Sequence, residues 1–305
     1  MATQSAPAEF SLKATGQVAR RQALSRLSRY VLLSATLFAV LMLVFLAIDV
    51  IQTGWSAISL DFFTNYPSRR PAQAGLRSSL LGWLWLMGTV IVLAIPLAVG
   101  TALFVEEFAP KNWFTSLVRL NISNLAGVPS IIYGILGLAV FVRGFEFAGI
   151  TIIPALGPTI LAGALTLTLM ILPMTVIASV EAIRQVPPSI RDGSLALGAT
   201  RWQTVWYHIL PGAMPGIMTG VILAVARAAG ETAALIMIGA FAFIAFDNTG
   251  LNQSFTTVPI QIYNWTTLPQ EAFRQNAAAG IIVLMVLIVG LNLIAVLIRE
   301  RFRRV

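Results

Sequence analysis

Six apolar segments of membrane-spanning length dominate this sequence and restrict it to the class of integral membrane proteins. About 20 apolar residues in a helix cross the hydrocarbon core of a bilayer. The chain is 57% hydrophobic and only 10% charged, whereas soluble domains carry roughly 25% charged residues. We therefore predict an all-α integral membrane protein with six transmembrane helices, at residues 30–51, 80–104, 122–142, 159–180, 212–238 and 277–298.

The spans divide the 305-residue chain into a membrane domain and two short polar tails. We expect an N-terminal tail at 1–29, a six-helix domain at 30–298 and a basic C-terminal tail at 299–305. The first apolar run is too long for a signal peptide and lacks a clear small-residue cleavage site, so we expect it to be retained.

Basic residues are distributed unevenly between the alternate polar segments, and this predicts the orientation in the membrane. With both termini in the cytoplasm, inner segments hold fourteen Lys and Arg and outer segments hold five. Cytoplasmic loops of membrane proteins carry such an excess. We therefore expect both termini, and the polar loop at 181–211, to be cytoplasmic. We also attribute the net charge of +8 to orientation rather than to nucleic-acid binding.

Several chemistries lack the residues that they need. The chain has no cysteine and a single histidine, His208, so disulfides, thiolate metal sites and His-rich metal sites are not expected. It contains no GxxxxGK[ST], GxSxG or HExxH motif. We expect neither an enzyme nor a cofactor, and uphill transport by this chain would need an ion gradient or a separate motor.

The loop at 181–211 has the pattern of a folded helical hairpin. Pro187 and Pro188 end the preceding helix, and Ser189 is a candidate N-cap with Asp192 three residues later. We expect a short helix, a glycine turn and a second short helix that stops at Pro211. An amphipathic hairpin on a membrane surface predicts a soluble docking partner; a solvated connector is the alternative.

Two ionisable residues lie well inside a predicted span. Arg227 and Glu231 are four residues apart, a spacing that places both on one helix face, close enough to pair. An arginine at the centre of a membrane helix costs about 2.5–3.5 kcal/mol on insertion scales. The pair therefore predicts either a cation that meets an anionic substrate beside Gly230 and Thr232, or a structural pair that fixes helix register. A ridge of small residues every four positions predicts helix packing in the same span: Gly212, Gly216, Gly220, Ala224 and Ala228.

The segment DGSLALGATRWQTVWYHILP resembles the EAA loop of bacterial ABC importer permeases, EAAxxxG followed by nine residues and IxLP. Gly198 occupies the glycine position, whereas Gly193, Ser194 and His208 depart from the pattern. The resemblance implies a type I importer permease fold whose loop docks on an ATPase. The ATPase-coupling residues that it implies are Asp192, Gly193, Ser194, Leu195, Leu197, Gly198, Leu210 and Pro211.

Further segments resemble the phosphate-specific importer permease of the PstA type over about residues 60–304. They include EEFAPKN, NISNLAGVPSIIYGILGL, ARAAGETAALI and QIYNWTTLPQEAF. The resemblance implies a bacterial inner-membrane subunit that pairs with a sister permease, two ATP-binding subunits and a periplasmic or extracellular phosphate-binding protein, within membrane lipid. It implies a substrate pathway at Arg227, Glu231 and Thr232. Alternatives are another oxyanion such as sulfate or molybdate, an intramembrane enzyme, and a non-transporting anchor or sensor.

Overall fold

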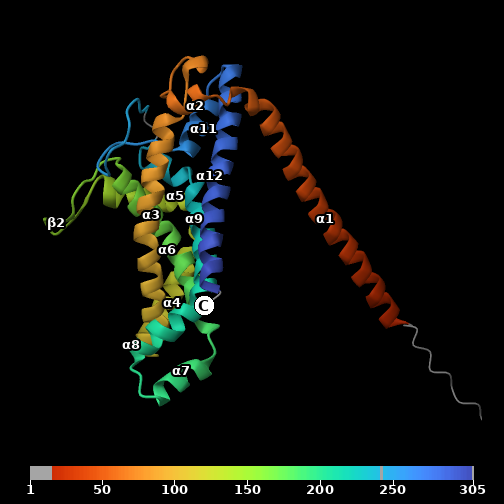
Figure 1. Ribbon diagram of the computed structural model, residues 1–305, viewed down its shortest axis with the longest axis vertical. Coiled ribbons are helices and arrows are strands. Elements are labelled where there is room, and N and C mark those ends of the chain that lie inside the picture. Colours follow the sequence, from red (N-terminus) through yellow and green to blue (C-terminus); the bar gives the residue numbers. More distant parts are fainter. Residues whose placement is uncertain (1–15, 241–242, 304–305) are drawn as a thin grey trace, which may run out of the picture. The chain divides into compact units, whose positions relative to one another are not determined.

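The computed structural model describes residues 16–240 and 243–303 and is mainly helical (Figure 1). Its helices in the described part are long membrane-length elements joined by short ones. The α-helices are α1 (Gln17–Gly54), α2 (Leu60–Thr64), α3 (Arg77–Leu103), α4 (Trp113–Ala126), α5 (Ser130–Gly137), α6 (Ile160–Arg184), α7 (Pro188–Ala196), α8 (Arg201–Thr204), α9 (Leu210–Ala229), α10 (Ala233–Met237), α11 (Val258–Thr266) and α12 (Glu271–Arg303).

The chain divides into two compact units, at residues 1–50 and 51–305. The first unit consists, in its described part, of most of α1, whose apolar window is fully exposed. This helix begins at Gln17, so the expected tail at 1–29 is helical over its second half. The remainder of that tail, residues 1–15, lies outside the described residues, as do residues 304–305 of the C-terminal tail.

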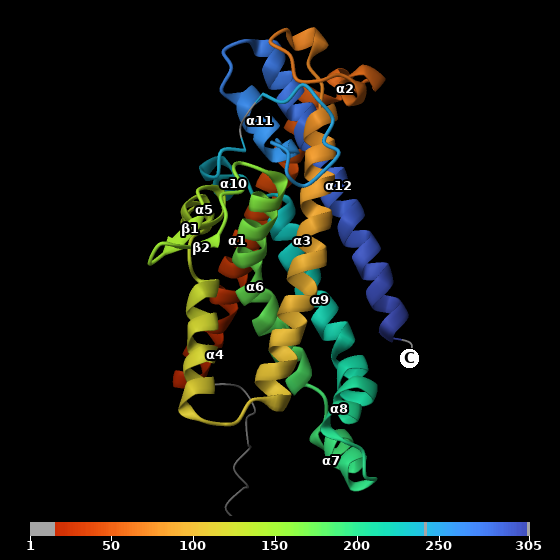
Figure 2. The same ribbon diagram turned by 90° about the vertical axis from the view of Figure 1, so that its left-hand side faces the viewer.

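The second unit is built on α3, α6 and α9, which pack against one another, and on α12, which packs against α9 (Figure 2). The small-residue ridge of α9 faces α6, because a Cβ at Gly216 would lie 2.7 Å from the Cβ of Ala182. A Cβ at Gly220 would lie 2.3 Å from the Cβ of Ala178. The prediction that this ridge is a packing face is confirmed, since glycine here lets the two backbones approach closely.

The third expected span is not one helix. The chain breaks after α4, and α5 continues at a bend of 104°. Pro129 causes the break, because it has no N–H to donate and it disfavours the helical conformation at Val128. Five helices of the described chain are long and apolar enough to cross a membrane, or six if this bent pair is one span.

The fifth expected span also ends earlier than predicted. Helix α9 stops at Ala229, and Gly230 follows it as the C-cap. The chain then forms the short helix α10 instead of continuing to residue 238. Arg227 therefore lies in the last turn of a helix, and Glu231 lies beyond the end of that helix.

Some of the segments between the expected spans contain ordered elements. The turn after residue 142 forms a small antiparallel hairpin of β1 (Phe145–Phe147) and β2 (Ile150–Ile153). Residues 52–79 contain α2 and two short 3-10 turns, and α11 folds within the segment at 247–276. These elements are shorter than a membrane span, so hydropathy alone does not reveal them.

An ion pair fixes the end of the second unit that carries α2 and α11. Arg77, the first residue of α3, donates two hydrogen bonds to the carboxylate of Asp247, at 2.8 and 2.5 Å. The hydroxyl of Tyr66 donates to the same carboxylate at 3.1 Å. The hydrogen bond from Arg77, with help from Tyr66, holds the pKa of Asp247 below its usual value. The contact joins the start of α3 to a loop 170 residues away.

Candidate functional site

The segment 181–211 forms a helical hairpin at the opposite end of the second unit (Figure 1). Helix α7 begins after Pro187, and no side chain caps it, so the expected N-cap role of Ser189 is wrong. Gly193 lies inside α7 rather than at a turn. The turn is at Gly198, whose φ of +88° is a conformation that favours glycine.

The second arm of the hairpin does not stop at Pro211. A reciprocal capping box between Thr200 and Gln203 starts α8. The helix then passes through a π-helical turn, Val205–Ile209, into α9, and the uninterrupted apolar helix runs from Arg201 to Ala229. Pro211 follows closely on the π-helical turn, where the regular hydrogen-bond pattern of the α-helix is already interrupted, so its missing N–H is tolerated there.

The residues of the EAA-like motif divide into those that close the hairpin and those that face outward. The Ser194 hydroxyl is buried and lies 3.0 Å from that of Thr204, which joins α7 to α8. Asp192 and Gly193 are exposed. Leu197 is 91% exposed, and Leu195 is also exposed. The motif therefore presents an apolar surface at Leu197 that no described residue of the second unit covers.

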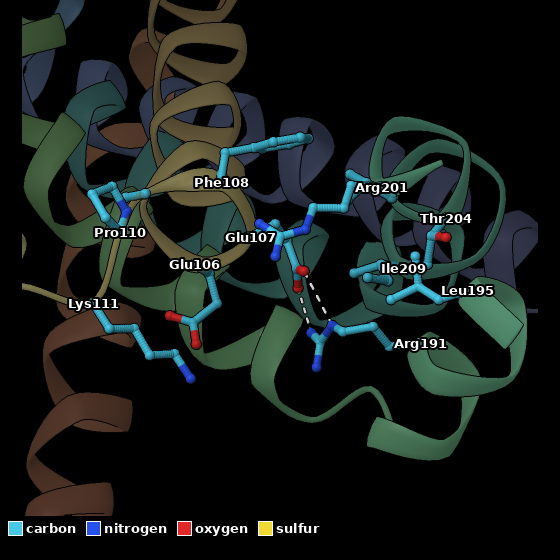
Figure 3. A pocket seen from close by; sticks show the side chains of 12 residues that line it. Glu106, Glu107, Phe108, Pro110, Lys111, Arg191, Leu195, Arg201, Thr204 and Ile209 are labelled. Carbon is cyan, nitrogen blue, oxygen red and sulfur yellow. Dashed lines mark hydrogen bonds and ion pairs between the residues drawn. The ribbon is translucent and has the colours of Figure 1, made fainter. Parts of the chain in front are cut away.

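A cavity of about 490 Å³ separates the hairpin from the end of α3 (Figure 3). The end of α3 passes into a π-helical turn, Phe104–Phe108, which places two consecutive glutamates at this cavity. The walls combine these carboxylates with three cations and an apolar floor. The lining includes Glu106, Glu107, Lys111, Arg191, Leu195, Arg201, Thr204 and Ile209.

The two glutamates have different partners. Glu107 pairs with Arg191 of α7 through two hydrogen bonds, one of them Nε to Oε2 at 3.1 Å (Figure 3). Glu106 pairs with Arg119 of α4 at 3.1 Å and with Arg184 at the end of α6 at 3.2 Å. The π turn therefore connects α3 to three other helices through charged contacts.

Sequence reasoning did not assign these glutamates. A usable signal was present: two adjacent acids directly follow a membrane-length segment, and three arginines, Arg184, Arg191 and Arg201, lie in the next loop expected on the same side. What the sequence lacks is the fold of the hairpin, which decides which arginine meets which acid.

Aromatic side chains extend the exposed surface along α8 and the π-helical turn that follows it. Trp202 and Trp206 stack with their ring centroids 5.8 Å apart. The ring centroids of Phe108 and Trp202 lie 6.1 Å apart. Both tryptophans are exposed. His208, in the same π turn as Trp206, is also exposed.

Arg227 is exposed and has no carboxylate partner among the residues that the structure describes. Its hydrogen bond within the described chain is a long one, 3.9 Å from Nη1 to the sulfur of Met174 on α6. Nearby, the indole N–H of Trp83 donates to the carbonyl of Ala229 at 2.9 Å, which ties the end of α9 to α3. The guanidinium is thus held on a fixed helix end, and its other donors have no partner among the described residues.

The expected pairing of Arg227 with Glu231 is wrong. The carboxylate of Glu231 accepts a hydrogen bond from the backbone N–H of Ala234 at 3.2 Å, so it caps the start of α10. The Thr232 hydroxyl donates to the carbonyl of Gly230 at 3.3 Å. The four-residue spacing failed because the helix ends between the two charges.

Comparison with known proteins identifies the family. Residues 94–304 match the family model described as "Binding-protein-dependent transport system inner membrane component". This match covers more than half of the chain, and the matched region contains α6, the hairpin and Arg227.

Curated relatives cover most of the chain. It is 33% identical over 256 residues to "Probable ABC transporter permease protein YqgI" of Bacillus subtilis, which covers 79% of this chain and 84% of that protein. It is 30% identical over 266 residues to "Phosphate transport system permease protein PstA 1" of Mycobacterium tuberculosis strain H37Rv, with 86% and 82% covered.

Solved structures share the fold. A bacterial alginate ABC transporter, crystallised with an alginate-bound periplasmic protein, matches with a TM-score of 0.64 at 16% identity, over 92% of this chain and 96% of that chain. At this identity the likeness shows the fold alone, and that fold is the one expected, a type I ABC importer permease. The chain therefore belongs to the family of binding-protein-dependent transport system inner membrane components, as a multi-pass, non-catalytic permease subunit of an ABC importer.

Proposed function

We propose that this permease moves inorganic phosphate into the cytoplasm and that Arg227 is the cation that the phosphate meets. The observation that carries the proposal is the guanidinium of Arg227, exposed and without a carboxylate partner in the described chain. An arginine in a membrane-length helix is costly and marks a functional site by default. A guanidinium presents a fork of donors that matches the paired oxygens of an oxyanion.

Glu231 and Thr232 have supporting roles in this proposal. Glu231 stabilises the break between α9 and α10 by capping α10. Thr232 adds a hydroxyl beside Gly230. These residues shape the end of the helix at which the anion meets Arg227.

Relatives support phosphate as the cargo. Phosphate transport permeases of Mycobacterium tuberculosis and Yersinia pestis are 30% and 27% identical to this chain. The name of the Bacillus subtilis relative states no substrate. Another oxyanion, such as sulfate or molybdate, is the second candidate, because the same guanidinium would bind it.

The proposed assembly contains a sister permease, two ATP-binding subunits and a phosphate-binding protein. The permease domain at 30–298 would lie in the bacterial inner membrane, with both tails and the hairpin at 181–211 in the cytoplasm. The ATPase would dock on the exposed residues of the hairpin, Leu197 above all. Ser194, Gly198, Leu210 and Pro211 would hold the hairpin in shape and join it to α9.

The test is ATP-dependent uptake of labelled phosphate into vesicles that hold the complete complex. We expect uptake to require ATP, to resist excess sulfate, and to fall at least about tenfold in Arg227→Ala, with the complex still assembled. The matched control is Arg274→Ala, since Arg274 forms only an exposed pair with Glu271. Inhibition of uptake by sulfate would contradict phosphate as the specific cargo. Normal uptake by Arg227→Ala would show that Arg227 is not part of the pathway.

A further inference from the structure

We propose that the ion pair between Glu107 and Arg191 is a latch that makes α7 and the end of α3 move as one body during transport. This inference rests on the proposed ATP-driven function. It assigns positioning roles to two residues outside the substrate pathway proposed at Arg227. Its consequence is that one docking helix drives two different membrane helices.

The connection of α7 to α9 runs along the backbone. Helix α7 leads through the Gly198 turn to α8, and α8 continues without interruption into α9. By contrast, α7 and α3 are 84 residues apart at the ion pair. A displacement of α7 can reach α3 directly only through side-chain contacts, and Glu107–Arg191 is a charged one.

The geometry of the pair is suited to carrying a displacement. The two hydrogen bonds join both carboxylate oxygens to two nitrogens of one guanidinium, and such bidentate pairs fix orientation as well as distance. The Glu107 side chain is only 8% exposed and that of Arg191 32%. Removing one partner of a largely buried pair leaves an uncompensated charge, so the pair resists separation.

The position of Glu107 also favours this role. Its neighbour Glu106 holds Arg119 and Arg184, so the same π turn is fixed to α4 and α6. Within a π turn, an inserted residue redirects neighbouring side chains, and such turns are frequent at functional sites. The end of α3 is therefore anchored to α4 and α6 by ion pairs, and Glu107 reaches α7 from this anchored turn.

The first experiment measures coupling. Uptake and ATP hydrolysis would be recorded in the same vesicles for the wild-type complex, Glu107→Gln, Arg191→Gln and Arg191→Lys. We expect the glutamine variants to hydrolyse ATP but to transport about tenfold less phosphate per ATP, because the charged contact is lost. Arg191→Lys should be intermediate, since lysine keeps the charge without the bidentate geometry. Glu271→Gln, which breaks an exposed pair, is the matched control.

The second experiment does not depend on the cargo. The chain has no native cysteine, so spin labels can be placed specifically at Phe104→Cys and Ser189→Cys, both exposed positions. We expect one narrow distance that is the same without nucleotide and with ATP. In Glu107→Gln the distribution should broaden and respond to ATP.

The outcomes separate the two proposals. Failure of the wild-type complex to transport phosphate overturns the proposed cargo. The distances between the spin labels still test the latch in that case. A wild-type complex that transports, together with glutamine variants of unchanged transport per ATP, overturns the latch alone. A label distance that changes with ATP while the ion pair is intact also overturns it.

Discussion

The indole of Trp83 on α3 holds the last carbonyl of α9, that of Ala229, through a hydrogen bond of 2.9 Å. This contact lies two residues beyond Arg227 and immediately before the helix ends at Gly230. It fixes the point at which the membrane helix gives way to the short α10. The position of the free guanidinium therefore depends on a side chain of another helix.

Trp83→Phe should destabilise the protein by about 1–3 kcal/mol, the cost of leaving a buried acceptor without its donor. The phenyl ring is smaller than the indole, so the cavity that it leaves at this buried site adds to the cost. The free energy of unfolding in mixed micelles would measure the effect. Trp113→Phe is the control, because Trp113 is exposed and its indole forms no hydrogen bond with the described residues. Equal stability of the two variants would contradict the prediction.

Gly220→Ala should destabilise the contact of α6 with α9 by about 1–3 kcal/mol, the usual cost of overpacking. The added methyl would lie 2.3 Å from the Cβ of Ala178. The double variant Gly220→Ala with Ala178→Gly should recover most of the loss. Gly290→Ala on α12 meets nothing within 4 Å and serves as the control. Thermal unfolding of the four proteins decides the matter, and no recovery in the double variant would count against close packing at this point.

Asp247→Asn should reduce stability at neutral pH but not in acid. The hydrogen bond from Arg77 lowers the pKa of Asp247 in the folded state below its usual 3.8. A carboxylate with a lowered pKa stabilises the fold above the unfolded-state value, and this contribution is lost as the pH falls through the folded-state value. The unfolding midpoints of wild type and Asp247→Asn should therefore differ above about pH 4 and converge below it. A difference that stays constant from about pH 7 to about pH 2 would show that the charge of Asp247 is not its cause.

Leu197→Glu should weaken binding of the ATP-binding subunits by about tenfold or more without unfolding the permease. The side chain is 91% exposed, so a charge costs little in the free chain but much in an apolar contact. The double variant Leu195→Glu with Leu197→Glu should abolish ATP-driven uptake. Co-purification of the ATP-binding subunits measures the association, and Leu197→Met is the conservative control. Retained association and uptake in the double variant would mean that the hairpin docks elsewhere.

Membrane-length segments and the small-residue ridge of α9 were predictable because they depend on local composition and on the helical repeat. The ends of elements were less predictable. Pro129 lies inside the third expected span, but whether a proline bends a helix or breaks it depends on the neighbouring helices. The end of α9 at Gly230 separated Arg227 from Glu231, and the capping of α10 by Glu231 gave the acid another partner.

The candidate site was predicted where the chain carries a rare residue and missed where it depends on tertiary pairing. An arginine inside an apolar run stands out in any sequence, so Arg227 was found. Glu107 stands in an ordinary charged connection, and only the folded hairpin brings Arg191 to it. Contacts between residues 84 positions apart are not visible in the spacing of a single sequence.

The unbroken helix from Arg201 to Ala229 makes the angular position of Arg227 depend on the number of residues that separate it from the hairpin. Each residue of an α-helix turns the chain by about 100°. A single-residue deletion between the hairpin and Arg227 would preserve every side chain of both sites and yet aim the guanidinium at a different neighbour. If both proposed sites act in transport, the number of residues between them is therefore expected to affect uptake even when every side chain of the two sites is kept.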